Sequence, residues 1–388
     1  MRYNPLNPPI TPARWENFTN KVTDPEGDIT ERLLIQSISN LELKKENKII
    51  ISLSSGIDSS ICLALLRKVF HDKEIIAINA MFSKNFDESK KAKDIATKFQ
   101  AKFKVVKIDS IFTRMPELVS ITGKPRWNTY QYIIASEAAK YGNVLVTGDG
   151  ADEIFAGYTF RYHKFLGMIK HNRNWKIKTK AYLECHNRDW VPDQKNMFGK
   201  AIKFSWDDIY QYFKSYFSNK LSALEQLMLA DFNGKLLYDF IPTGRSICKF
   251  YGIRGAPIFL DASVIKFGLR IPMMQKYGDK NQQGKITLRK IAKRLGVEHI
   301  NEKKGFSPDI IIDWETHGKK ISEYYLLKKS SHIYTNKLIN YDWVLKAFEK
   351  VEDDGDIRYL NRLISILGLE IWYRIFISKE MKASQKLS

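Results

Sequence analysis

The stretch at residues 48–66, KIIISLSSGIDSSICLALL, constrains the fold of this chain more than any other. An apolar run from Ile49 to Leu53 is typical of a buried strand, a turn of small hydroxyl residues and one glycine follows, and a helix is expected to begin at or near Asp58. A strand that turns into a helix N-terminus gathers free backbone amides and the positive end of the helix dipole. The stretch therefore predicts an anion-binding turn. It is not a Walker A loop, because the pattern GxxxxGK(S/T) occurs nowhere in the sequence.

Residues 47–160 alternate between expected strands and expected helices. The strands are predicted at Lys48–Leu53, Glu74–Phe82, Phe103–Ile108 and Val144–Thr147, and the helices at Ser59–Phe70, Asp87–Phe99 and Tyr130–Tyr141. This alternation with short connections predicts an α/β fold with a doubly wound parallel sheet. Right-handed crossovers would bring the carboxyl ends of the strands to one edge, where such sheets bind ligands.

Two further segments flank this core. Residues 1–46 are expected to form an N-terminal arm with a lead-in helix at Ile29–Leu41, and residues 161–388 a mainly helical part that completes the active site. The helical spacing in that last part is clearest at Tyr210–Phe217, Ala223–Asp231, Ile286–Leu295, Lys337–Phe348 and Ile357–Phe376. We predict segment boundaries at 46 and 160.

Composition excludes several classes of protein. No run of about 18 apolar residues occurs, so no membrane span is expected. The three cysteines are widely spaced, which suits a reducing cytoplasm and argues against a zinc site or a disulfide framework. The net charge of +20 fits a nucleic-acid partner, polyanionic small substrates or a lysine-rich composition, and we favour the last interpretation.

A second stretch, VLVTGDGADEIFAGY at 144–158, places acids after another strand. Asp149, Asp152 and Glu153 would lie at the same sheet edge as the first turn. Carboxylates that face a triphosphate need a divalent cation between them, because like charges repel. We therefore predict Mg²⁺ that bridges phosphate oxygens to Asp58 and Asp152.

Together these stretches resemble the asparagine synthetase family of N-type ATP pyrophosphatases. Residues 54–59, SSGIDS, are similar to the SGGxDS pyrophosphate loop, and TGDGADEIFAGY at 147–158 matches the family pattern almost throughout, with Ala156 where glycine is common. The resemblance covers roughly residues 30–380 and implies a sheet of the adenine nucleotide alpha hydrolase type. Ser55 replaces a family glycine; it would either crowd the phosphates or donate its hydroxyl to one of them.

The resemblance extends to GKITLRKIAKRLGVEHINEKKGFSP at 284–308, which looks like the GKxxLR and KxGF segments of the family. It implies that Lys303 is the catalytic lysine, which stabilises charge on the α-phosphate and on pyrophosphate. Asp149 would face the reacting carboxyl and the incoming amine, and Asp152 is the third expected catalytic residue. The residues expected to bind ATP are Leu53, Ser54, Ser55, Gly56, Asp58, Ser59, Ala80, Thr147, Gly148, Lys285 and Arg289.

A fourth stretch departs from the family pattern. GIRGAPIFLD at 252–261 is similar to GxExRxPFLD, but Arg254 replaces the glutamate and Ala256 the arginine. Because the segment lies near the acid substrate in the family, charge reversal there is expected to change which acid is held. Arg254 and Asp261 are the expected substrate-binding residues.

The function implied is that of an ATP-dependent amide-forming ligase. It would adenylate aspartate or a related acid and transfer ammonia or an amine to it, releasing AMP and pyrophosphate. Arg2 follows Met1, so no N-terminal cysteine is expected to release ammonia from glutamine, and a separate glutaminase subunit would be a partner. The sequence leaves the acid, the nitrogen donor and the oligomeric state open.

Two alternatives remain. Residues 161–183 contain seven Lys or Arg with interleaved aromatics and no acid, a composition that suits single-stranded nucleic acid and supports the alternative of a tRNA-modifying enzyme of the same superfamily. We favour the other interpretation of this stretch, a solvated basic face whose aromatics dock into the protein. The losses at Arg254 and Ala256 favour a degenerate paralogue that binds a nucleotide without turnover.

Overall fold

A five-stranded parallel sheet organises the chain in the computed structural model, which describes residues 11–43, 46–81, 89–107, 109–129, 131–186, 190–278, 281–298 and 310–388. The sheet has the order β3-β2-β1-β4-β5, and every neighbouring pair is parallel. Its strands are β1 (Lys48–Ser52), β2 (Glu74–Met81), β3 (Lys102–Lys107), β4 (Val144–Thr147) and β5 (Arg254–Pro257). Ile49, Ile50 and Ile51 are buried, as expected for a central strand covered on both faces. The predicted α/β doubly wound sheet is confirmed.

The chain reverses its direction of winding between β1 and β4. From β1 the sheet grows through β2 to β3 on one side, and β4 and β5 lie on the other side. Ile51 is in register with Val146, so the residues that leave β1 and β4 emerge side by side. Such a switch point is where open α/β sheets form their ligand-binding crevice.

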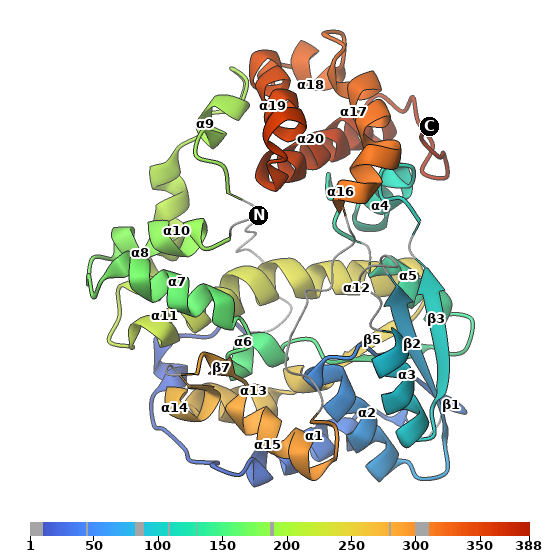
Figure 1. Cartoon of the computed structure of the whole chain (residues 1–388), viewed down its shortest axis with the longest axis vertical. Coiled ribbons are helices and arrows are strands. Elements are labelled where there is room, and N and C mark those ends of the chain that lie inside the picture. Colours follow the sequence, from blue (N-terminus) through green and yellow to red (C-terminus); the bar gives the residue numbers. More distant parts are fainter. Residues whose placement is uncertain are drawn as a thin grey trace. The chain divides into compact units, whose positions relative to one another are not determined.

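Helices cover both faces of the sheet (Figure 1). On one face, α2 packs against β1 and β4, and α3 packs against β2 and β3; α5 and α12 lie against the other face. Helices α1 and α15 pack in turn on α2. Their bounds are α1 (Asp28–Ser39), α2 (Ile57–Val69), α3 (Ser89–Lys98), α5 (Tyr132–Ala138), α12 (Ile241–Phe250) and α15 (Ile286–Arg294).

The chain divides into two compact units, of which the first, Met1–Lys107, Gln131–Ala181 and Phe213–Phe306, contains the sheet. Its other elements are α6 (Ala151–Phe155), α7 (Thr159–Ile169), α11 (Ala223–Ala230), α13 (Ala262–Arg270), α14 (Met273–Lys276), the hairpin strands β6 (Tyr277–Gly278) and β7 (Gln283–Gly284), the short 3₁₀ turns Trp15–Phe18 and Ile258–Leu260, and the π-helical stretch Asp231–Phe240. Helices α8 (Trp175–Glu184) and α10 (Trp206–Phe217) each contain residues of both units.

The second unit, Ile108–Tyr130, Tyr182–Tyr212 and Ser307–Ser388, is helical in its described part. Helix α20 (Ile357–Phe376) is its centre, with Leu363, Ile364 and Leu367 fully buried and α4, α17, α18 and α19 packed around it. The remaining bounds are α4 (Met115–Thr122), α9 (Gln194–Met197), α16 (Ile310–Asp313), the π-helical turn Trp314–Gly318, α17 (Lys319–Leu326), α18 (His332–Thr335) and α19 (Tyr341–Asp354). In the described part of the chain no helix has the length and apolar character of a membrane span. The segment boundaries at 46 and 160 stay a prediction.

Candidate active site

The turn between β1 and α2 is fixed by its own hydrogen bonds. Leu53 leaves the sheet with its N–H donated to the Ile78 carbonyl (2.8 Å), and Asn79 Nδ2 donates to the Leu53 carbonyl (2.8 Å). The Ser54 N–H donates to Ser59 Oγ (3.1 Å), and the Gly56 N–H donates to Ser54 Oγ (3.0 Å). The sequence analysis missed the contribution of Asn79 to this turn. A polar residue near the carboxyl end of a buried strand is the signal that could have indicated it.

Helix α2 begins at Ile57, one residue before the predicted start. The amides of its first turn have no intrahelical carbonyl to bond, so they and the helix dipole suit a phosphate group. Ser55 is buried and its φ is not positive, so the backbone does not require the family glycine at this position. The predicted strand, turn and helix start are therefore present, and the binding of an anion by the turn stays a prediction.

The turn after β4 lies directly against the first turn. A β-carbon on Gly148 would be 3.1 Å from Asp58 Cβ, which shows how closely the two backbones approach. Gly150 has a left-handed φ of 94°, and a β-carbon there would also be 2.2 Å from Leu260 Cδ2. Asp149 is exposed and accepts a hydrogen bond from Thr147 Oγ1 (2.8 Å), while Asp152 follows in the first turn of α6.

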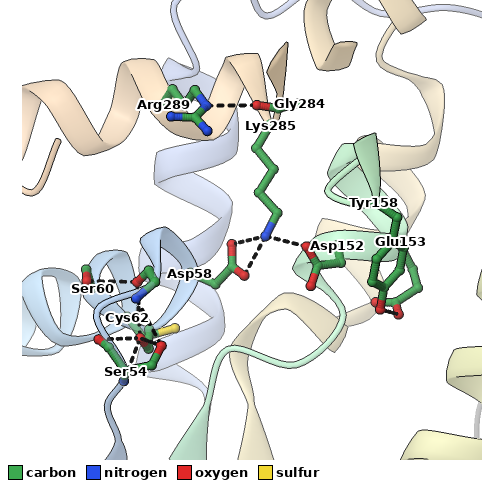
Figure 2. Close-up of polar contacts among 12 residues, drawn as sticks. Ser54, Asp58, Ser60, Cys62, Asp152, Glu153, Tyr158, Gly284, Lys285 and Arg289 are labelled. Carbon is green, nitrogen blue, oxygen red and sulfur yellow. Dashed lines mark hydrogen bonds and ion pairs between the residues drawn. The ribbon is translucent and has the colours of Figure 1, made fainter. Parts of the chain in front are cut away.

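Lys285 joins the two turns (Figure 2). Its Nζ lies 2.7 Å from Asp58 Oδ1 and 2.6 Å from Asp58 Oδ2, and 2.5 Å from Asp152 Oδ1. The two residues predicted as Mg²⁺ ligands are therefore brought together, with an ammonium group between them. The sequence analysis placed Lys285 among the residues that bind ATP and did not anticipate this contact.

The backbone around Lys285 explains why its side chain points into the site. The residue has a left-handed φ of 57°, donates its N–H to the Phe155 carbonyl (3.1 Å) and immediately precedes α15. A β-carbon on the preceding Gly284 would be 2.2 Å from the Ala156 carbonyl oxygen, so only glycine allows this approach. Arg289, one turn later, donates from Nε to the Gly284 carbonyl (2.9 Å), which ties the helix start to the β7 end.

The Lys285 side chain is only 5% exposed, and the side chains of Asp58 and Asp152 are 17% and 14% exposed. Burial opposes the ammonium charge, but Asp152 and Asp58 outweigh it and raise the pKa of Lys285 above its ordinary value. In the described part of the chain no group of three or more His, Cys, Asp or Glu side chains forms a metal site. Two carboxylates nevertheless fit Mg²⁺ bound together with phosphates, because that ion keeps waters and takes one or two carboxylates.

A charged cluster next to Asp152, with Glu153 and Tyr158 buried and Lys235 half-buried, was not predicted. Tyr158 donates from its hydroxyl to Glu153 Oε1 (2.6 Å), and Lys235 Nζ lies 3.7 Å from the centre of the Tyr158 ring. Burial and the nearby Asp152 raise the pKa of Glu153 to about 7, while burial and Arg161 lower the pKa of Lys235 to about 8. Lys235 belongs to the π-helical stretch Asp231–Phe240, a rare conformation that often occurs at functional sites.

The other predicted site residues differ in how close they lie to the two turns. Ala80 lies near the carboxyl end of β2, at the same sheet edge as the two turns. Arg254 is the first residue of β5, in register with the first residue of β4, so it lies at the opposite edge and donates to the Leu41 carbonyl (3.0 Å). Asp261 caps α13 by accepting from the Ser263 N–H (2.8 Å). Lys303 lies outside the described residues.

The aromatics of the basic stretch 161–183 include core residues. Tyr162 and Phe165 are buried on α7, and Lys178 is buried and donates to Gln226 (2.8 Å). Arg161 is buried in a two-point ion pair with Asp231, with N···O distances of 2.9 and 2.8 Å. The favoured interpretation, in which the aromatics dock into the protein, is confirmed for these two rings.

Sequence similarity relates the chain to asparagine synthetases. The asparagine synthase family model matches residues 30–374. The glutamine-hydrolysing asparagine synthetase 1 of Bacillus subtilis (strain 168) is 24% identical over 405 aligned positions, which cover 94% of this chain and 62% of that protein. A putative glutamine-hydrolysing asparagine synthetase of Mycobacterium tuberculosis (strain H37Rv) is 34% identical over 113 residues, 28% of this chain and 17% of that protein. The chain thus spans less than two thirds of the length of either relative.

Among solved structures, a tRNA thiolase from Methanococcus maripaludis with its iron–sulfur cluster matches 74% of this chain and 87% of that chain. The TM-score is 0.27 and the sequence identity is 15%. We draw no functional conclusion from this similarity.

Proposed function

The chain belongs to the asparagine synthase family of ATP-dependent amidoligases, and on that premise we propose that it adenylates a small carboxylic acid and passes the acyl group to ammonia or an amine. Aspartate is the first acid to consider, because the relatives are asparagine synthetases. One observation carries the proposal: the turns after β1 and β4 meet at the switch point of the sheet, where Lys285 joins Asp58 to Asp152.

ATP would lie across these two turns. The first-turn amides of α2 and the hydroxyls of Ser54 and Ser59 would bind phosphate, and Lys285 and Arg289 would hold the pyrophosphate portion. The remaining residues proposed to contact ATP are Leu53, Ser55, Gly56, Asp58, Ala80, Thr147 and Gly148. A carboxylate oxygen of the acid attacks the α-phosphorus. The bond between the α-phosphorus and the oxygen that it shares with the β-phosphate breaks, and pyrophosphate leaves.

Asp58 and Asp152 would hold Mg²⁺, which when bound neutralises charge on the leaving pyrophosphate. Asp149, exposed and oriented by Thr147, would contact the incoming amine, either to take its proton or to position it. Attack of the amine on the acyl carbon then expels AMP and forms the amide. We propose Lys303 as the residue that stabilises the α-phosphate during adenylation.

ATP–pyrophosphate exchange tests this function. Labelled pyrophosphate should enter ATP only when Mg²⁺ and an acid are both present, and a screen of aspartate and other small acids should identify the substrate. Lys303→Ala should abolish exchange with ATP affinity retained within several-fold, whereas Lys290→Ala, on the exposed side of α15, should exchange normally. If no acid supports exchange although ATP binds, the chain is a nucleotide-binding paralogue instead.

The nitrogen donor needs a separate experiment. We propose that ammonium salts support amide formation with this chain and that glutamine does so only when a glutaminase subunit is added. Amide formation with glutamine alone would contradict this assignment. In parallel, a tRNA complex whose affinity falls steeply between low and moderate salt would favour the tRNA-modifying alternative.

A further inference from the structure

We propose that Lys285 is an internal cation that holds the position of the divalent metal until a nucleotide binds. The inference rests on the proposed function for the nucleotide, but the position of the ammonium group is a feature of the structure. Lys285 Nζ lies 2.7 Å or less from three oxygens, two on Asp58 and one on Asp152. These are the carboxylates proposed to bind Mg²⁺.

A divalent metal and the Lys285 ammonium group would compete for the same carboxylates. Mg²⁺ needs carboxylate oxygens at about 2.0–2.1 Å and would lie within a few ångströms of the Lys285 ammonium group, where like charges repel strongly. Binding of the metal is therefore favoured only when the ammonium group moves away from the carboxylates. Conversely, without either cation Asp58 and Asp152 would face each other unscreened in a largely buried site.

The ammonium group has a restricted set of places to go. Its residue is anchored by the N–H bond to Phe155 and by the close approach of Gly284 to Ala156, and its side chain is 5% exposed. A β-carbon on Gly157 would be 2.4 Å from Lys285 Cε, so the lysine stem is also confined from that side. Leaving the carboxylates without another anion would strand a buried charge.

Nucleotide phosphates supply that anion. The first turn of α2, which carries Asp58, presents the phosphate-binding amides, so a bound triphosphate would lie next to the Lys285 side chain. The lysine would then exchange its carboxylate partners for phosphate oxygens while the metal takes the carboxylates. Metal and nucleotide should therefore bind cooperatively, and free metal should bind weakly.

Binding of Mn²⁺ to the full chain, followed by electron paramagnetic resonance in the absence of nucleotide, tests the proposal. Wild type should bind Mn²⁺ weakly, and Lys285→Gln should bind it at least tenfold more tightly because the carboxylates are vacated. Lys290→Gln, an equal charge change on the exposed side of α15, should match wild type. The gain in Lys285→Gln should disappear when Asp58→Asn is added. Equal Mn²⁺ affinity of wild type and Lys285→Gln would overturn the proposal.

A thermal denaturation measurement covers the case in which the variant folds poorly. Lys285→Gln should unfold at a lower temperature than wild type, and Mn²⁺ alone should restore much of the loss while leaving wild type unchanged. A variant that is unfolded and that millimolar Mn²⁺ does not rescue counts against the proposal. Neither measurement uses an acid or turnover, so failure of the exchange assay would overturn the proposed function and leave this inference standing.

Discussion

Gly157 lies directly against Asp152, so closely that a β-carbon on Gly157 would be 1.8 Å from Asp152 Oδ1. The same carbon would be 2.4 Å from Lys285 Cε. The glycine is therefore needed for space, because both members of the Lys285–Asp152 ion pair occupy the volume that any larger side chain would take. The last glycine of the second motif thus has a steric role in the site.

Gly157→Ala should therefore damage both stability and nucleotide binding. Displacing Asp152 should cost about 1–3 kcal/mol in unfolding free energy, as overpacking does in other proteins, and should weaken binding of ATP with Mg²⁺. Urea denaturation and calorimetric titration measure the two effects. Gly167→Ala is the matched control: nothing lies within 4 Å of its β-carbon position in α7, so it should gain up to about 1 kcal/mol. Similar behaviour of the two variants would contradict the steric argument.

Arg161→Met should be among the most destabilising single changes in the sheet-containing unit. The Arg161–Asp231 pair is buried, with side chains 2% and 1% exposed, so removing Arg161 takes a two-point charged partner away from a buried carboxylate. The expected loss is about 3–5 kcal/mol by urea denaturation. Adding Asp231→Leu should recover part of it, and strictly additive losses would contradict the coupling. In the exposed pair Lys350–Asp354, with side chains 53% exposed, Lys350→Met should cost under about 1 kcal/mol.

Lys276 should make stability depend on pH. The residue is 1% exposed, its Nζ lies 3.5 Å from the Leu269 carbonyl, and burial together with Lys21 lowers its pKa to about 7 from 10.5. Between those values the unfolded chain binds more protons than the folded protein, so stability should rise with pH from about 7 to 10.5 and fall as pH decreases through 7.

Lys276→Met should remove this pH dependence and stabilise the protein at pH 7 by an amount on the order of a few kcal/mol. The difference in unfolding free energy between the variant and wild type should be smaller at pH 10, because the buried lysine destabilises the wild-type protein less there. Urea denaturation from pH 7 to 10 measures the difference, with the exposed Lys266→Met as control. Parallel pH profiles for wild type and Lys276→Met would show that Lys276 stays charged when folded.

The sequence predicts the sheet well because its strands carry their own signal. β1 and β4 are short apolar runs bounded by turn residues, and the observed strands end within one residue of the expected ends. β5 was missed, because Arg254–Pro257 contains a charge, a glycine and a proline and pairs only at the sheet edge. Helix α19 begins at Tyr341 and not at Lys337, because the Asn340 side chain caps it by accepting from the Asp342 N–H (3.0 Å).

The site was only partly predictable, for a physical reason. Motifs place Asp58 and Asp152 at one sheet edge, because parallel strands deliver their carboxyl ends together. The contact of Lys285 with Asp58 joins residues 227 positions apart. It depends on the left-handed backbone conformation of Lys285, which no local sequence pattern predicts. Lys235 reaches Tyr158 from a π-helical stretch, which sequence periodicity does not indicate.

The family pattern and the structure place Arg254 at different sites, and this difference can be tested. The pattern places the residue near the acid substrate, yet the strand register puts it at the edge opposite Asp149, bonded to the Leu41 carbonyl. Arg254→Glu should therefore leave acid-dependent ATP–pyrophosphate exchange within about twofold of wild type and the choice of acid unchanged. Asp149→Asn, at the proposed site, should lower amide formation by about 10²-fold or more if it moves a proton. A changed acid preference in Arg254→Glu would show that the acid substrate is recognised at the amino end of β5.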